Sequence, residues 1–67
     1  MAVDDLKGMA DQELVDELYD TRRELMNLRF RAATMQLSDV NQIKRTKKRV
    51  AQILTVMRQR ELESVVE

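Results

Sequence analysis

The chain of 67 residues contains no cysteine, histidine, proline or tryptophan, and it has one glycine, one tyrosine and one phenylalanine. Without cysteine and histidine it forms no disulfide, and zinc sites and histidine-based acid–base catalysis lose their usual groups. The turn residues that a sheet protein needs are nearly missing. A domain of this size buries only about 60% of the surface that its unfolded chain exposes, so we expect a partner to support its small core.

Signals for membranes or export are missing as well. No apolar run approaches the roughly 20 residues that span a bilayer. The N-terminus, residues 1–5, carries early acids and no apolar stretch of the kind found in secretory signals. We therefore expect no membrane association, and the lack of cysteine is compatible with a reducing cytoplasm.

Two amphipathic helices dominate the pattern. From Leu14 onward, apolar residues and Thr21 recur in alternating steps of four and three, which is typical of a helix that packs along one seam. We predict helices over about residues 11–34 and 39–62, joined by residues 35–38, within one domain over residues 1–67. So short a joint makes the helices antiparallel neighbours, and the predicted fold class is all-α, a two-helix hairpin. The predicted seams consist of Leu14, Leu18, Thr21, Leu25, Leu28, Ala32 and Met35, and of Ile43, Thr46, Val50, Ile53, Leu54 and Met57.

Short segments and capping residues lie at the ends of the predicted helices. Residues 1–10 are too few for a long helix, so we expect Val3, Leu6 and Met9 to fold back as one short turn over the open end. A hairpin has a single interface between its helices, so we predict a weak monomer that docks on something larger. The candidate N-caps are Ala10 or Asp11 for the first helix and Ser38 or Asp39 for the second.

A net charge of zero conceals a segregation of sign. Residues 1–28 hold eight acids against three bases, whereas residues 29–60 hold nine bases against one acid. One reading is that an acidic helix neutralises a basic one. The other is that the bases bind a polyanion, because bases so close together repel one another in an isolated helix. With Val50 at the centre of the buried face, most of them fall on the opposite arc. This cluster consists of Lys44, Arg45, Lys47, Lys48 and Arg49.

The first helix carries a second apolar stripe beside its seam, and one facing helix cannot cover both. Either the stripe faces an outside partner or the N-terminal turn folds over part of it. Arg29, with Asn27 close by, suits contact with a phosphate or a base, and Arg31 lies on the other side of the helix. The partner-facing residues of the stripe are Val15, Tyr19, Met26 and Phe30.

No enzyme is expected from this sequence. Gly8 is the only glycine, so a glycine-rich phosphate loop is excluded. Carboxylates four residues apart, such as Asp16 and Asp20, are typical of a solvated helix face, and a two-helix hairpin has no cavity that would desolvate them. We predict no metal site and no cofactor.

Two runs resemble one family. Residues 24–37 read ELMNLRFRAATMQL and residues 43–58 read IKRTKKRVAQILTVMR. Together they resemble the signature of the bacterial large-subunit ribosomal protein twenty-nine family, and the match extends over about residues 9–61. The resemblance implies a hairpin bound to large-subunit ribosomal RNA near the exit of the peptide tunnel. It further implies a neighbouring ribosomal protein and nascent-chain factors as partners.

The resemblance also implies roles for single residues. Asn27 and Arg29 would contact RNA from the first helix, Lys47 and Lys48 would lie on the phosphate backbone, and Thr55 matches a threonine of the family. Methionine at position 35 replaces the usual glycine, which disfavours a left-handed C-cap. Together with the basic cluster, the predicted RNA-binding set is Asn27, Arg29, Arg31, Lys44, Arg45, Lys47, Lys48, Arg49, Thr55 and Arg58.

Two hypotheses of function follow. The leading one is a structural constituent of the large ribosomal subunit, in the cytoplasm, that binds ribosomal RNA near the tunnel exit. The alternative is a dimeric helical bundle acting as an adaptor or regulator, with Tyr19, Met26 and Phe30 in the dimer core.

Overall fold

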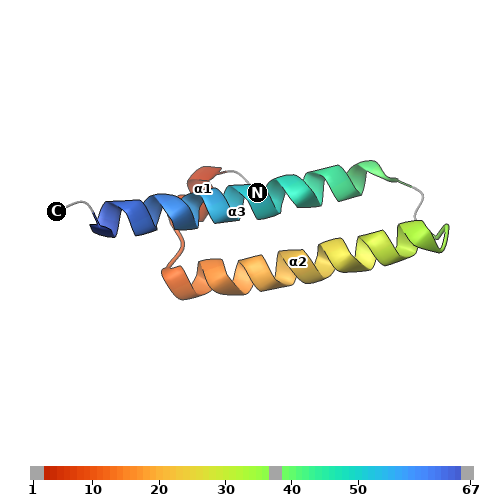
Figure 1. Ribbon diagram of the computed structural model, residues 1–67, viewed down its shortest axis with the longest axis horizontal. Coiled ribbons are helices and arrows are strands. Elements are labelled where there is room, and N and C mark those ends of the chain that lie inside the picture. The colour runs from red at the N-terminus through yellow and green to blue at the C-terminus, as the bar shows by residue number, and fades with distance from the viewer. Residues whose placement is uncertain (1–2, 37–38, 66–67) are drawn as a thin grey trace.

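The computed structural model describes residues 3–36 and 39–65, and all regular structure in these two ranges is helical. The helices are α1 (Val3–Lys7), α2 (Asp11–Ala33) and α3 (Asn41–Val65). Helices α2 and α3 lie side by side and antiparallel, in a rod of 51 × 17 × 16 Å (Figure 1). The predicted all-α hairpin of long helices with a short N-terminal turn is therefore confirmed.

The ends of the helices lie close to the predicted ones. Helix α2 begins after Ala10, which is its N-cap and makes no side-chain hydrogen bond to the helix. Helix α3 begins two residues later than predicted, because Asp39 forms a turn ahead of it. The Asp39 side chain accepts a hydrogen bond from the backbone N–H of Asn41 at 3.0 Å. The other candidate cap, Ser38, lies outside the described residues, as does half of the predicted joint.

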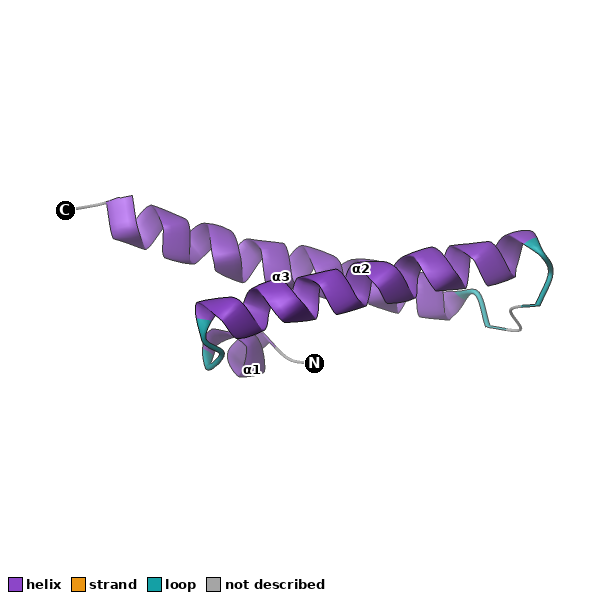
Figure 2. Cartoon of the chain, turned by 90° about the horizontal axis from the view of Figure 1, so that it is seen from below, coloured by secondary structure: helices purple, strands orange, loops and turns teal. Residues whose placement is uncertain are grey.

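The core gathers at the open end of the hairpin, where α1 covers the seam. Leu6 from α1, Leu14 from α2 and Ile53 and Val56 from α3 are all almost completely buried. Figure 2 shows α1 at the end where α2 begins. The expected fold-back of the N-terminal turn is confirmed for Leu6, and Met9 packs against the same cluster. The side chain of Val3 lies outside the described part of the chain.

Two predicted seam positions are wrong. Leu54 is 40% exposed, whereas Val56, which the predicted seam omits, is buried. On a helix these two residues lie about 160° apart, on opposite flanks. Because α1 packs against the Val56 flank, the buried face of α3 is rotated away from Leu54. Met35 is also wrong as a seam residue, since it is 95% exposed beyond the end of α2.

Helix α2 ends in a left-handed turn at a methionine, which corrects the expectation drawn from the missing glycine. The φ of Met35 is 60°. The Gln36 N–H donates to the Arg31 carbonyl at 2.8 Å and the Met35 N–H to the Ala32 carbonyl at 3.2 Å. This is the Schellman pattern, which caps two of the last carbonyls of a helix. These hydrogen bonds hold Met35 in a conformation that ordinarily favours glycine.

Replacing Met35 by glycine is therefore expected to stabilise the hairpin. A left-handed conformation costs a residue with a side chain about 1–2 kcal/mol, and glycine adopts it freely. We expect Met35→Gly to raise the free energy of unfolding by about 1 kcal/mol, measured by thermal unfolding followed by circular dichroism. Met35→Ala is the control. It keeps the strain and removes only an exposed side chain, so equal stabilisation by alanine would contradict this explanation.

The seam between α2 and α3 contains two buried threonines. Thr21 is 1% exposed and Thr46 is 5% exposed, at the two positions where the seam pattern lacks an apolar residue. The Thr21 Oγ1 has no hydrogen-bond partner among the described residues. A buried hydroxyl without a partner costs about 1–3 kcal/mol.

We therefore expect Thr21→Val to raise the free energy of unfolding by about 1 kcal/mol, because valine keeps the shape and removes the unpaired hydroxyl. Urea unfolding measures the change. The matched control is Thr34→Val, since the exposed Thr34 hydroxyl already donates to carbonyls of α2. A gain in stability at position 34 but not at position 21 would contradict this explanation.

Candidate nucleic-acid interface

The outward side of α3 carries a basic surface. Lys44, Lys47 and Lys48 are exposed, and none of them forms an ion pair with a described residue. Their spacing of three and one places them on one side of the helix, opposite the buried Ile53. Thr55 and Arg58 continue the same line toward the C-terminal end and are exposed too. We call these five residues the outer basic face.

Two members of the outer basic face have partners on their own helix. The Thr55 hydroxyl donates to the Ala51 carbonyl at 2.8 Å. The Arg58 Nη1 lies 3.4 Å from the Glu61 carboxylate, and both side chains are about two thirds exposed. An exposed pair of this kind contributes little to stability, so Arg58 remains available to a stronger anion. The lysines therefore provide most of the free positive charge.

Three more predicted cations, Arg31, Arg45 and Arg49, face a groove between α2 and α3. This inter-helix groove has a volume of about 800 Å³ and lies toward the joint between the two helices. Its lining includes Asn27 and Arg31 from α2 and Arg45, Lys48 and Arg49 from α3. Lys48 thus belongs both to the groove and to the outer basic face. The structure brings these five predicted residues together.

Within the groove, Arg49 holds the two long helices to each other. Its Nη2 donates to the Glu17 carboxylate at 2.6 Å, and its Nη1 lies 3.8 Å from the Glu24 carboxylate. The side chains of Arg49 and Glu17 are 34% and 22% exposed, so water screens this pair only in part. Nearer the joint, Arg45 pairs with Asp39 at 3.2 Å, but both side chains are more exposed. The charge of Arg49 is therefore already balanced within the chain.

Arg29 stands apart from the groove. It is exposed, and two residues further along the helix Arg31 points about 160° away. Arg31 lines the groove, so Arg29 lies on the opposite flank of α2. The two arginines therefore cannot serve one compact site, although each is accessible.

The second apolar stripe of α2 is largely uncovered. Tyr19, Met26 and Phe30 are 67%, 71% and 67% exposed. Val15 differs, because it is half-buried and lines a hollow of about 280 Å³ together with Leu14 and Met57. Since α1 packs against α3, it does not cover the three large residues. The alternative that the N-terminal turn folds over the stripe is therefore wrong for these three residues.

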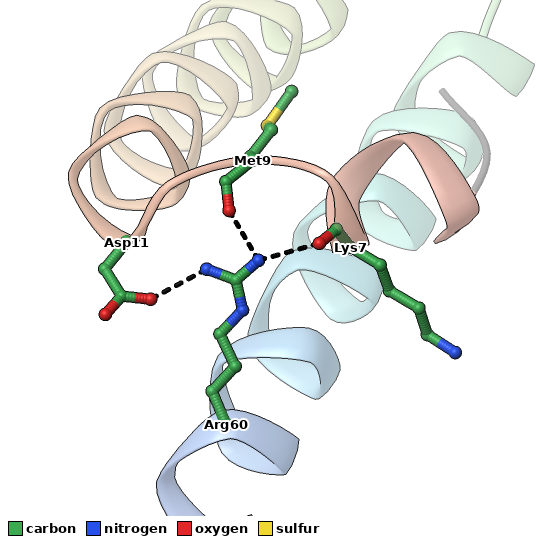
Figure 3. Close-up of polar contacts among 4 residues, drawn as sticks. All are labelled: Lys7, Met9, Asp11 and Arg60. Atoms are coloured by element: carbon green, nitrogen blue, oxygen red, sulfur yellow. Dashed lines mark hydrogen bonds and ion pairs between the residues drawn. The ribbon is translucent and has the colours of Figure 1, made fainter.

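Arg60 is an important residue that the sequence analysis missed. Its side chain comes from α3 and is 29% exposed. One nitrogen donates to the Asp11 carboxylate at 2.7 Å, and the other donates to the carbonyls of Lys7 and Met9 (Figure 3). Arg60 thus ties together the end of α1, the connecting segment and the first residue of α2. The sequence pattern that could have identified Arg60 is the seam spacing, because Arg60 lies seven residues after Ile53.

The described parts of the chain contain neither a metal site nor a membrane-spanning helix. Residues 3–36 and 39–65 hold no group of three acidic residues, cysteines or histidines that is suited to a metal ion. The same two ranges contain no helix that is long and apolar enough to cross a membrane.

Most of the chain matches a known family. The model of that family, described as Ribosomal L29 protein, matches residues 4–60. The chain belongs to the ribosomal L29 protein family. Among its relatives, the following three carry the name large ribosomal subunit protein uL29. That of Crocosphaera subtropica is 42% identical over 60 residues, which cover 90% of this chain and 77% of the relative. That of Persephonella marina is 44% identical over 62 residues, which cover 92% and 91%. That of Caldicellulosiruptor bescii is 46% identical over 63 residues, which cover 94% and 88%.

Membership of the ribosomal L29 family fixes the class of function. The chain is a structural protein of the large ribosomal subunit, in the cytoplasm as part of the ribosome, and it is not an enzyme. The resemblance seen in residues 24–37 and 43–58 is confirmed. Between the two hypotheses, membership favours the ribosomal constituent over the adaptor.

Proposed function

We propose that the chain binds large-subunit ribosomal RNA through the outer basic face of α3. The observation that carries this proposal is the set of three exposed lysines, Lys44, Lys47 and Lys48, without an acidic partner among the described residues. Like charges at this spacing weaken a helix when nothing lies against them. A phosphodiester backbone removes that repulsion and releases its own counterions as it binds.

The geometry favours contact with the RNA backbone over reading of a paired sequence. Lysines act as point charges on flexible stems, and they suit phosphates whose positions vary. The deep major groove of an A-form helix is closed to side chains, so paired RNA is bound through its shape, sugars and phosphates. We therefore assign to the outer basic face the role of fixing the hairpin on the RNA.

Helix α2 supplies further contacts in this proposal. Arg31 and Asn27 bind RNA at the inter-helix groove, opposite Arg45 of α3, and Arg29 binds it from the other flank of α2. We leave Arg49 out of the RNA-contacting set, because the close pair with Glu17 already balances its charge.

The apolar stripe of α2 meets a protein in this proposal. Tyr19, Met26 and Phe30 are too large and too exposed for an isolated solvated helix, and aromatic residues with methionine are enriched in protein interfaces. We propose a neighbouring ribosomal protein as the occupant. The resemblance implies that this neighbourhood is the exit of the peptide tunnel, where nascent-chain factors dock.

The salt dependence of RNA binding tests the proposal. Each phosphate that is neutralised adds about 0.7–0.9 to the slope of log binding constant against log salt concentration, so about four contacts predict a slope near −3. Filter binding of the wild-type chain to large-subunit ribosomal RNA over a salt series measures it. A slope near zero would contradict binding through the outer basic face.

A further inference from the structure

The inter-helix groove differs in chemistry from the outer basic face. Its floor is formed by Leu28 and Thr46, which are 7% and 5% exposed. Three amide side chains line it, from Asn27, Gln42 and Gln52, together with the carboxylate of Glu24. The groove is therefore a polar hollow with an apolar floor inside a basic rim.

A phosphate group does not suit the interior of this groove. A phosphate offers only hydrogen-bond acceptors, and each amide side chain offers an acceptor as well as a donor. The Glu24 carboxylate adds a negative charge, since it is 53% exposed and lies 3.8 Å from the nearest Arg49 nitrogen. A phosphate inside the groove would therefore be repelled by the negatively charged carboxylate of Glu24.

A nucleobase suits the same interior. The edge of a base presents donors and acceptors together, and amide side chains pair with both. Its flat face packs on an apolar side chain or on the plane of a guanidinium, here Leu28 below and Arg31 or Arg45 at the rim. The volume of about 800 Å³ lies within the range of sites that hold small molecules, so a base with part of its ribose has room.

We propose that the inter-helix groove receives the base of one unpaired nucleotide of the ribosomal RNA, while the cations at its rim hold the flanking phosphates. The inference rests on the proposed RNA-binding function and specifies its substrate at this site. Only an unpaired nucleotide can enter, because the edges of paired bases are already occupied.

Chemical probing of reconstituted large subunits tests this inference. Subunits are assembled with the wild-type chain, with Asn27→Ala/Gln52→Ala, or without the chain. Dimethyl sulfate, kethoxal and carbodiimide then report the exposed edges of all four bases, and hydroxyl radicals report the RNA backbone. We expect the wild-type chain to lower the reactivity of at least one unpaired base about threefold or more, and the double variant to lose that protection while keeping the backbone footprint.

The matched control is Gln12→Ala/Gln59→Ala, which removes two exposed amides outside the groove and should keep the base protected. A backbone footprint with equal base reactivity for the wild-type chain and Asn27→Ala/Gln52→Ala would overturn the inference and leave the proposed function standing. A missing backbone footprint with the wild-type chain would overturn both.

Discussion

Reversing the charge of Lys47 and Lys48 to glutamate is expected to weaken binding to large-subunit ribosomal RNA about 100-fold. Each reversal removes one phosphate contact and places a carboxylate beside the same phosphate. At about 1–1.5 kcal/mol for each position, the two together give a factor of that size. The slope of log binding constant against log salt should also become shallower by about 2. Filter binding at several salt concentrations measures both quantities.

A control for this variant comes from the other helix. Arg22→Glu/Arg23→Glu changes the net charge by the same amount, on two adjacent exposed residues of α2 that form no ion pair with a described residue. Circular dichroism of both variants verifies that the hairpin still forms. Equal loss of RNA affinity in the two variants would mean that total charge decides binding, and the specific role of the outer basic face would be lost.

Replacing Arg60 by methionine is expected to cost about 2 kcal/mol of the free energy of unfolding. The change removes charge-assisted hydrogen bonds to the Lys7 and Met9 carbonyls and to the Asp11 carboxylate, while methionine keeps most of the aliphatic stem. The Asp11 side chain is 88% exposed, so its part is discounted for screening by water. We expect a loss of melting temperature of about 10 °C, measured by circular dichroism.

Two observations separate this role of Arg60 from a general loss of positive charge. Arg58→Met, two residues earlier, breaks only an exposed pair with Glu61 and should cost less than about 0.5 kcal/mol. Limited proteolysis should cut Arg60→Met faster between α1 and α2 than it cuts the wild-type chain. Equal melting temperatures for the two methionine variants would contradict the proposed tie between α1, the connecting segment and α2.

Local pattern was enough to predict the long helices and most of the seam. Leu14, Leu28 and Ile53 follow helical spacing, and burying that spacing against one partner helix leaves few alternatives. The exposure of Tyr19, Met26 and Phe30 followed from the same geometry, because one facing helix covers one stripe only.

The predictions that failed depend on tertiary or capping contacts. Val56 is buried in place of Leu54 because α1 returns to one flank of α3, and periodicity within α3 does not register that return. Met35 adopts a left-handed conformation because two capping hydrogen bonds outweigh its own preference, one from the Gln36 N–H to Arg31 and one from its own N–H to Ala32. In both cases a tertiary or capping contact prevails over the local preference.

Among the described residues, the bases of α3 fall into a paired group and an unpaired group, which composition alone did not predict. The acids of α2 neutralise the inward arginines Arg49 and Arg60, while Lys44, Lys47 and Lys48 stay unpaired within the described residues. The interpretation that acids of one helix neutralise bases of the other therefore holds for Arg49 and Arg60, and the proposal of RNA binding applies to the three lysines. Arg49 and Arg60 each use a fork of donors to tie elements of the chain together, whereas the charges of the three lysines face outward.

Directed hydroxyl-radical probing detects whether the outer basic face lies against ribosomal RNA in the large subunit. The chain has no cysteine, so Lys48→Cys or Asp20→Cys provides a unique position for a tethered iron chelate. In reconstituted large subunits, we predict strong cleavage of the RNA backbone from position 48 and weaker cleavage from position 20, which lies about two turns before Asn27 on the same flank of α2. Strong cleavage from position 20 with none from position 48 would contradict RNA binding through the outer basic face.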